Sequence, residues 1–188
     1  MEKTGIRSAI RQARRVERHR LGDRGWRNRG DHLALTVTDH RQVRQVCQLG
    51  GVITSYASFG NEPPTDALNS TLLNRGARVL LPVTARDGDV FPKLAWVDAS
   101  DPDGPVVGVG PVGLAALGCQ VMLIPALAVT PDGQRLGQGG GYYDQLLVDV
   151  ARFEDGGPLR IAIVGAAEVL ETVPSDPHDQ PMDLFVTG

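Results

Sequence analysis

The distribution of apolar residues predicts short buried strands that alternate with helices. Continuous apolar runs predict strands over 51–57, 78–83, 121–124, 160–165 and 184–187. A more exposed strand is expected over 93–98, where apolar and polar residues alternate. Strands that alternate with helices are typical of an α/β sheet, because each crossover helix returns the chain to lie parallel beside an earlier strand.

Helices are expected in the first fifty residues. A narrow apolar stripe predicts a basic helix over 3–20, and its members are Ile6, Ile10, Ala13 and Val16. Glycines and polar residues over 22–30 interrupt this periodicity and predict a loop. A second helix is expected over 31–49, because Gly50-Gly51 follows it as a terminator.

Two further helices are predicted from their end signals. Thr65 is the expected N-cap of a helix that stops at Gly76. Another helix is expected over 142–153, directly after a run of glycines. Residues 100–118 are rich in glycine and proline, and we expect irregular structure there.

These elements predict an α/β fold of three layers, in which helices cover both faces of a mostly parallel or mixed central sheet. The 188 residues fit one domain without an internal repeat or linker, so residues 1–188 are expected to form a single domain. Ligands of open α/β sheets bind at the carboxyl ends of the strands. The loop over 126–141, which follows the strand over 121–124, is therefore a candidate binding site.

Composition excludes several classes of protein. The net charge is −3, and the nine arginines of the first 29 residues have a single aromatic residue, Trp26, among them, so no nucleic acid partner is expected. No apolar run reaches the length of a membrane span, and the first residues lack the apolar segment of a signal peptide. Cys47 and Cys119 lie in apolar surroundings and are predicted to be free thiols in the reducing cytoplasm.

The candidate chemistry is concentrated in residues 135–144, which read Arg-Leu-Gly-Gln-Gly-Gly-Gly-Tyr-Tyr-Asp. Glycines let backbone N–H groups close around an anion, and Arg135 can clamp a phosphate with two hydrogen bonds. Asp144 can bind the divalent cation that phosphate chemistry requires. A helix that begins at Tyr142 adds free N–H donors. This combination predicts a phosphate-binding site, for a nucleotide with a metal ion.

Two common nucleotide-binding fingerprints do not fit this loop. It lacks the Gly-Lys-Ser/Thr ending of a P-loop, and no lysine lies near it. Its glycines, at 137, 139, 140 and 141, do not have the Gly-x-Gly-x-x-Gly spacing of dinucleotide sites. The alternative that remains open is a flexible surface turn.

The segment from Pro125 to Leu146 resembles the signature of the 5-formyltetrahydrofolate cyclo-ligase family, also called methenyltetrahydrofolate synthetases. The matching positions are Asp132, Gly133, Arg135, Leu136, Gly137, Gly139, Gly141, Tyr142, Tyr143 and Asp144. Three weaker matches follow the family order, and they are Lys3-Thr-Gly-Ile-Arg7, Asn61-Glu62-Pro-Pro-Thr65 and His178-Asp179-x-x-x-Asp183. The resemblance therefore extends over nearly the whole chain.

The resemblance implies a Rossmann-like α/β fold similar to the NagB/RpiA/CoA transferase-like fold. It also implies a ligase reaction that depends on ATP and Mg²⁺. In this reaction the formyl oxygen of 5-formyltetrahydrofolate is phosphorylated, N10 attacks, and 5,10-methenyltetrahydrofolate, ADP and phosphate form. The expected partners are ATP, Mg²⁺ and a folate, polyglutamylated or not, without nucleic acid or membrane. We expect a monomer or a weak dimer.

The resemblance assigns roles to individual residues. Arg135 and Tyr143 are the expected catalytic residues, and Asp144 and Asp179 are the expected magnesium ligands. One of the two neighbouring tyrosines should pack inward while the other lines the site. The expected ATP-binding residues are Lys3, Arg7, Arg135, Leu136, Gly137, Gln138, Gly139, Gly140, Gly141, Tyr142 and Tyr143.

Glu62 is the expected substrate contact. It lies past a predicted strand and before two prolines, and a rigid carboxylate suits the N–H donors of a pterin ring. Ala57 or Phe59 is expected to line the same pocket. From position alone, a solvated acid in a loop is the favoured interpretation of Glu62.

The chain also departs from the family pattern. Gln138 stands where members often have an aromatic or basic residue, and Gly140 where some carry a lysine. Residues 108–111 read Gly-Val-Gly-Pro where many members have Gly-x-x-Glu-Pro. Two alternatives therefore remain open: a non-catalytic regulator that binds a nucleotide or folate, and an α/β enzyme that acts on another phosphorylated or carbonyl substrate.

Overall fold

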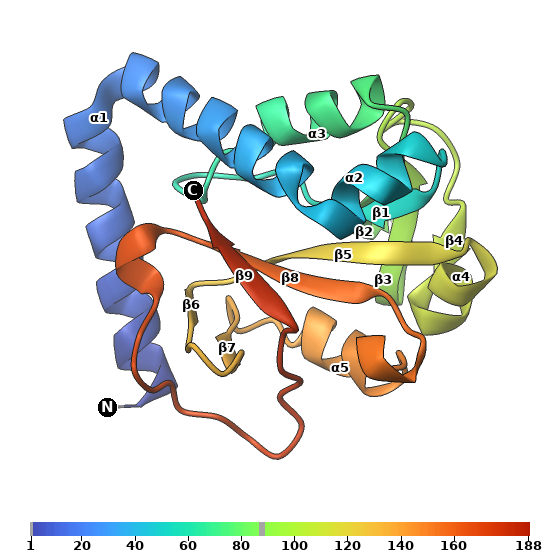
Figure 1. The fold of residues 1–188 in the computed structure, drawn as a ribbon. Helices are drawn as coiled ribbons and strands as arrows, with labels where there is room; N and C mark the ends of the chain where they lie inside the picture. The colour runs from blue at the N-terminus through green and yellow to red at the C-terminus, as the bar shows by residue number, and fades with distance from the viewer. Residues whose placement is uncertain (1, 87–88) are drawn as a thin grey trace.

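The centre of the fold is a seven-stranded sheet with the strand order β4-β3-β2-β1-β5-β8-β9 (Figure 1). The computed structural model describes residues 2–86 and 89–188. Five neighbouring strands are parallel, and they are β1 (Val52–Thr54), β2 (Arg78–Arg86), β5 (Cys119–Pro125), β8 (Leu159–Val164) and β9 (Leu184–Thr187). Two antiparallel strands complete one edge, and they are β3 (Asp89–Asp98) and β4 (Gly108–Val109).

Helices cover both faces of this sheet, which confirms the predicted three layers (Figure 1). The second half of α1 (Lys3–Asp39) lies on one face with α2 (Arg41–Gln48) and α3 (Asp66–Asn74), while α4 (Gly110–Ala116) and α5 (Tyr142–Val148) lie on the other. Each face has its own apolar core, because the central strands are buried on both sides. None of the described helices is long and apolar enough to cross a membrane.

Helix α1 corrects the loop that was expected over 22–30. Within α1 the backbone leaves helical angles at Gly22, where φ is 63°, a conformation that favours glycine. The helix bends there, so that its first half runs beside β6 (Ala128–Val129) and β7 (Arg135–Leu136), and its second half crosses the sheet (Figure 1). The helix expected over 31–49 is divided at His40, whose ψ of 133° is extended.

Tertiary contacts explain why 23–30 is helical despite its glycines. A Cβ at Gly30 would lie 3.3 Å from Pro64 Cγ, so this glycine permits close packing. Arg29 forms an ion pair with Glu17 of 2.7 Å across the bend. The guanidinium groups of Arg18 and Arg29 each lie 5.3 Å from the ring centroid of Trp26. These contacts compensate for the low helix propensity of glycine.

Three other expectations were wrong in part. The segment over 100–118 was expected to be irregular, but it contains β4 and α4. The helix is compatible with Pro111 because this residue occupies the first turn, where proline is tolerated. Helix α5 ends at Val148, short of the expected residue 153, and a 3₁₀ turn over Phe153–Asp155 follows. A second 3₁₀ turn covers Ala166–Glu168. The remaining predicted strands and the helix that follows Thr65 are confirmed within a few residues. The strand expected over 93–98 is part of β3, but residues 94–97 are buried, so the greater exposure predicted for it was wrong.

The structure also tests the predictions for Thr65 and for the two cysteines. Thr65 precedes α3, but its hydroxyl donates to the Tyr56 carbonyl oxygen at 2.7 Å, so it does not cap the helix. Both cysteines are free thiols as predicted, with Cys47 buried and Cys119 half-buried. Burial raises the pKa of the Cys119 thiol to about 12, so this thiol is not a reactive nucleophile.

Candidate functional site

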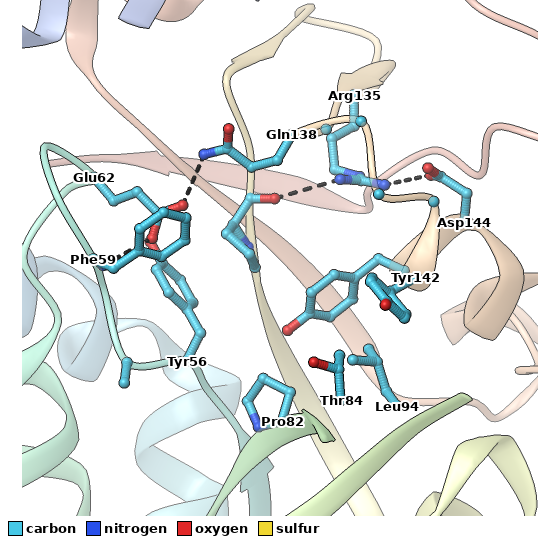
Figure 2. A pocket seen from close by; sticks show the side chains of 17 residues that line it. Tyr56, Phe59, Glu62, Pro82, Thr84, Leu94, Arg135, Gln138, Tyr142 and Asp144 are labelled. Atoms are coloured by element: carbon cyan, nitrogen blue, oxygen red, sulfur yellow. Dashed lines mark hydrogen bonds and ion pairs between the residues drawn. The ribbon is translucent and has the colours of Figure 1, made fainter. Parts of the chain in front are cut away.

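The main cavity lies where the sheet changes its direction of growth. The chain adds β2 on one side of β1 and β5 on the other, so the loops that follow β1 and β5 lead away from each other at the carboxyl ends of the strands and leave a crevice between them. Crevices at such switch points bind ligands in open α/β sheets. The cavity has a volume of about 490 Å³ and is lined by Tyr56, Ala57, Phe59, Glu62, Pro82, Thr84, Leu94, Pro125, Arg135, Gly137, Gln138, Gly139, Gly140, Gly141, Tyr142, Tyr143 and Asp144 (Figure 2).

Arg135 anchors the glycine-rich side of this cavity. Its side chain is only 5% exposed, and Nη2 donates to Asp144 while Nη1 donates to the Pro125 carbonyl oxygen at 3.4 Å. A Cβ at Gly137 would lie 2.6 Å from Arg135 Nη1. The loop can therefore pass this guanidinium only because residue 137 has no side chain.

The loop over 137–141 turns back toward α5 through left-handed backbone angles. Gly139 has φ 107° and Gly141 has φ 70°, values that residues with a Cβ rarely adopt. Two arginines of α1 hold this loop from outside the cavity. Arg7 Nε donates to the Gly137 carbonyl oxygen at 2.9 Å, and Arg11 Nη2 donates to the Gln138 carbonyl oxygen at 2.8 Å. With these carbonyls engaged on α1, the loop is fixed relative to the cavity.

Glu62 occupies the opposite side of the cavity and is 6% exposed. Its Oε1 accepts a hydrogen bond from Gln138 Nε2 at 2.8 Å, and its Oε2 accepts one from the Phe59 backbone N–H at 3.2 Å (Figure 2). Burial raises the pKa of the Glu62 carboxyl, although these two hydrogen bonds oppose that rise. Phe59 is 72% exposed and offers an apolar ring at the rim.

Three polar groups that line the cavity lack a partner in the described part of the chain. They are the hydroxyls of Tyr56 and Tyr143 and the Nε of Arg135. Burial raises the pKa of both phenols above the ordinary value, so both are neutral donors near pH 7. Buried polar groups in proteins are nearly always hydrogen-bonded, so unpaired groups on a cavity wall are positions for ligand atoms.

The two predicted metal ligands are each paired with a cation. Asp144 contacts Arg135, and Lys3 Nζ lies 2.7 Å from Asp179 and 2.6 Å from Asp176. Burial raises the pKa of the Asp179 carboxyl, but hydrogen bonds from Lys3 and the Asp176 backbone, with the charges of Lys3 and Arg135, bring it below the ordinary value. The Asp179 carboxylate is therefore ionised near neutral pH.

The described residues contain no group of three or more metal-ligating side chains. The pair of aspartates therefore fits Mg²⁺ only as one or two carboxylate ligands, with phosphate oxygens and water filling the other positions, which is how this ion is often bound. Because the charge of Arg135 acts on both Asp144 and Asp179, both carboxylates belong to one electrostatic environment.

The structure gathers most, but not all, of the predicted site residues around the cavity. Glu62, Ala57 and Phe59 line it together with Arg135 and loop residues 137–144. The two neighbouring tyrosines differ, since Tyr143 packs against the core and Tyr142 is 41% exposed. Three predicted ATP-binding residues are not among its lining, since Lys3 turns to two aspartates, Arg7 contacts the loop, and the Leu136 side chain lies in a core cluster.

Sequence reasoning missed two residues of the site. Tyr56 lies within the predicted strand over 51–57 and just after the observed β1, and its position at a carboxyl strand end was the available signal. Arg11 lies four residues after Arg7, so the helix-face argument that joins Lys3 and Arg7 extends to it.

Comparisons with known proteins agree with this geometry. The model of the 5-formyltetrahydrofolate cyclo-ligase family matches residues 2–188. A 5-formyltetrahydrofolate cyclo-ligase of Mycolicibacterium smegmatis is 36% identical over 151 residues, which cover 73% of this chain and 74% of that protein. The mouse enzyme of the same name is 23% identical over 145 residues and 70% of each chain.

A solved structure shares the fold over almost the full length. It is a 5,10-methenyltetrahydrofolate synthetase from Mycoplasma pneumoniae, with a TM-score of 0.73, 21% identity, and 98% of each chain covered. The match of the family model to nearly every residue and the identity to the mycobacterial protein both exceed what a shared fold alone produces. This chain therefore belongs to the 5-formyltetrahydrofolate cyclo-ligase family.

Proposed function

We propose that this protein catalyses the ATP-dependent cyclisation of 5-formyltetrahydrofolate to 5,10-methenyltetrahydrofolate, with release of ADP and phosphate. One observation carries the proposal. A single cavity joins a glycine loop with a buried arginine on one side to a buried carboxylate acceptor on the other, in a chain of this family. The reaction requires a phosphoryl donor and a pterin to meet in one place.

The glycine loop is the proposed phosphate side of the cavity. Glycines at 137, 139, 140 and 141 leave backbone N–H groups accessible to phosphate oxygens. Arg135 adds a charged donor whose Nε is unpaired. We assign Arg7 and Lys3 to the outer part of the nucleotide, where each cation already lies close to the loop or to Asp179.

Glu62 is the proposed acceptor for the pterin ring. Each of its oxygens accepts one hydrogen bond from the protein, which leaves a lone pair on each for an N–H donor of the substrate. Ala57 and Phe59 supply apolar surface beside it. The cavity volume of about 490 Å³ falls within the range of small-molecule sites, roughly 300–1,000 Å³.

The chemistry needs positioning and positive charge more than a protein nucleophile. Transfer of the γ-phosphoryl group of ATP to the formyl oxygen releases ADP and converts that oxygen into a leaving group. N10 then attacks the formyl carbon and loses its proton to solvent, the C–O bond breaks, and phosphate departs as the ring closes. Arg135 would stabilise the charge of the transferring phosphoryl group, and the Tyr143 hydroxyl would donate to an oxygen at the reacting centre.

Asp144 and Asp179 are the residues that we propose to hold Mg²⁺. Asp144 pairs with Arg135, and the charge of Arg135 also acts on Asp179. When bound, Mg²⁺ supplies neutralisation of phosphate charge. Lys3 and Arg135 would then exchange part of their contact with these carboxylates for contact with phosphate oxygens.

The test is an assay of the purified protein with 5-formyltetrahydrofolate and Mg-ATP. We expect the methenyl chromophore to appear, with one ADP and one phosphate per product formed. Omission of ATP should abolish product, and the exposed Arg20→Ala variant should retain wild-type rates as a matched control. ATP binding without product would instead support a regulator, and the absence of ATP binding would support an enzyme with another substrate.

A further inference from the structure

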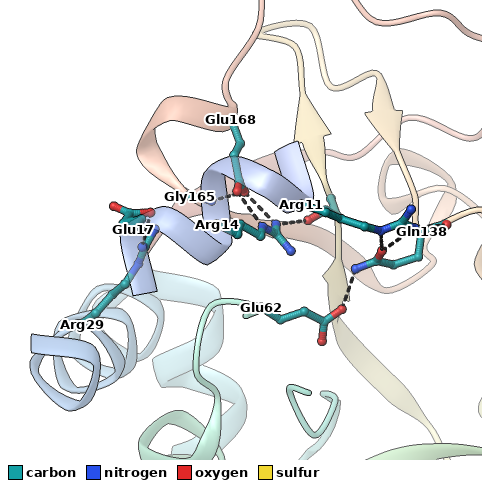
Figure 3. Close-up of polar contacts among 9 residues, drawn as sticks. Arg11, Arg14, Glu17, Arg29, Glu62, Gln138, Gly165 and Glu168 are labelled. Carbon is teal, nitrogen blue, oxygen red and sulfur yellow. Dashed lines mark hydrogen bonds and ion pairs between the residues drawn. The ribbon is translucent and has the colours of Figure 1, made fainter. Parts of the chain in front are cut away.

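Three side chains from distant parts of the chain form a continuous series of hydrogen bonds at the cavity (Figure 3). Arg11 of α1 donates to Gln138 Oε1 from Nη2 at 3.1 Å and from Nε at 3.3 Å. Gln138 Nε2 in turn donates to Glu62 Oε1 at 2.8 Å. The glycine loop thereby connects the basic helix to the buried carboxylate.

The direction of this series follows from the chemistry of its members. A guanidinium only donates hydrogen bonds, so the amide oxygen of Gln138 must face Arg11. The amide NH₂ group must then face Glu62, which has to accept as a carboxylate. The opposite orientation would place NH₂ against the donors of Arg11 and the amide oxygen against Glu62. Arg11 therefore selects the orientation of the amide that favours an ionised Glu62.

Gln138 and Glu62 also form a wall between two cavities. Both residues line the 490 Å³ cavity and a second cavity of about 280 Å³, which is otherwise lined by Phe59, Gly60 and Asn61 and by Arg11, Arg14 and Arg15 of α1. The hydrogen bond between the two residues thus sets the edge of the main cavity. The position of the Glu62 carboxylate depends on this contact and on the backbone N–H of Phe59.

Several charged or titratable groups act on Glu62 from the surrounding elements. The charge of Arg14 lowers the pKa of the Glu62 carboxyl, whereas burial raises it. The neutral phenol groups of two tyrosines also interact with the Glu62 carboxylate. They belong to Tyr56, in the loop that carries Glu62, and to Tyr143 of α5. Loss of the donor on Gln138 would remove one of the contacts that oppose the effect of burial.

We propose that Gln138 is a positioning residue that holds the Glu62 carboxylate toward the pterin ring of the substrate, and that Arg11 fixes the orientation of its amide. This inference rests on the proposed function, and it assigns the Gln138 side chain to the folate side while its backbone remains in the phosphate loop. Gln138 is one of the positions at which this chain was found to depart from the family pattern. The hydrogen bonds from Arg11 to Gln138 and from Gln138 to Glu62 therefore orient the carboxylate that we propose accepts the pterin ring.

The first test replaces Gln138 by methionine, which keeps the length of the side chain and removes both amide groups. We expect KM for 5-formyltetrahydrofolate to rise about tenfold, the effect of losing one hydrogen bond to a charged group, while KM for ATP and kcat stay within about twofold. Gln138→Glu should raise KM further, because a second carboxylate would face Glu62. Unchanged KM for the folate in Gln138→Met would overturn the proposal.

The pH profile separates positioning from a merely structural effect. In Gln138→Met the pKa of Glu62 should rise, so the acidic limb of kcat/KM for the folate should move to higher pH. The exposed control Arg20→Ala should leave this limb in place. An acidic limb that does not move in Gln138→Met would contradict a role through Glu62.

A double-variant cycle tests the part of Arg11. Arg11→Ala should raise KM for the folate by a smaller factor than Gln138→Met. Adding Arg11→Ala to Gln138→Met should cause a smaller further rise than Arg11→Ala causes in the wild type, because only its contact with the Gln138 backbone carbonyl then remains to be lost. Effects on KM that multiply fully would contradict that assignment.

A binding measurement separates this proposal from the proposed function. If the wild-type protein forms no methenyl product, the proposed function fails, and calorimetric Kd values for 5-formyltetrahydrofolate then test Gln138 separately. Equal affinities of wild type and Gln138→Met would overturn the positioning role.

Discussion

Arg14 and Arg135 are both 5% exposed, yet their surroundings differ in kind. The Nε and Nη2 of Arg14 are both used within the protein: they donate to the two oxygens of Glu168 at 2.6 and 2.7 Å, and Nη2 also donates to the Ala126 carbonyl oxygen at 2.7 Å (Figure 3). Glu168 also accepts from the Gly165 N–H at 2.5 Å. Arg135 pairs with Asp144, but its Nε is buried without a partner among the described residues.

This difference separates a structural arginine from a functional one. A buried ion pair whose donors are used within the protein joins the elements that carry it, here α1 and the turn over Ala166–Glu168. A buried arginine with an unused donor on a cavity wall has a place for a ligand atom. A substitution of Arg14 should therefore lower stability more than activity, whereas a substitution of Arg135 should lower activity more than stability.

The largest expected effect is the loss of activity in Arg135→Ala. Because Arg135 would stabilise charge only as the phosphoryl group moves, kcat/KM should fall by about 10³, or roughly 4 kcal/mol. The free energy of unfolding in urea should change by no more than about 1 kcal/mol, since its partner Asp144 is partly exposed. A variant with near wild-type turnover would remove Arg135 from the catalytic site.

The next largest effect is the loss of stability in Arg14→Met. It leaves Glu168 buried without its cation, which costs about 3 kcal/mol of unfolding free energy, measured by urea denaturation. The double variant Arg14→Met/Glu168→Gln should lose less than the sum of the single variants. The kcat/KM of the folded protein should change far less than in Arg135→Ala. A larger loss of kcat/KM in Arg14→Met than in Arg135→Ala would contradict the division into a structural and a functional arginine.

Tyr143→Phe tests the unpaired hydroxyl on the cavity wall. It removes a group without a protein partner, so the unfolding free energy should stay within about 0.5 kcal/mol of wild type. The value of kcat should fall about tenfold, as expected for one hydrogen bond to the reacting centre. A variant that loses stability and keeps full activity would show that this hydroxyl serves the fold.

The smallest expected effect concerns the ion pair of Lys3 with Asp179. The pKa of Asp179 is lowered in the folded protein, so its stabilisation is present above the unfolded pKa and is lost as the pH falls through the folded pKa. Lys3→Met should therefore cost less than about 1 kcal/mol at pH 7, because the pair is partly exposed. This cost should begin to fall near pH 4, the ordinary pKa of aspartate, and should disappear only below the lowered pKa that Asp179 has in the folded protein. Thermal unfolding of both proteins across this range measures the difference, which should not grow toward acid pH.

Local patterns predicted the elements that local physics controls. The apolar runs over 160–165 and 184–187 became β8 and β9, because strands buried on both faces need continuous apolar sequence. The segment over 22–30 was mispredicted, because glycine lowers helix propensity while the close approach of Gly30 to Pro64 restores the helix through packing. In the site, the glycine loop was found directly, whereas Tyr56 and Arg11 were not, because neither belongs to a local motif.

The sequence by itself determined the family, the α/β class and the glycine loop, because each depends on residue types at short spacing. Only the tertiary structure decided which side chains meet, since Gln138 and Glu62 are 76 residues apart and Arg14 and Glu168 are 154 apart. Such pairs depend on strand order and on the bend at Gly22, which no local pattern specifies. Whether the Nε of a buried arginine is paired within the protein or remains for a ligand is therefore a property of the fold.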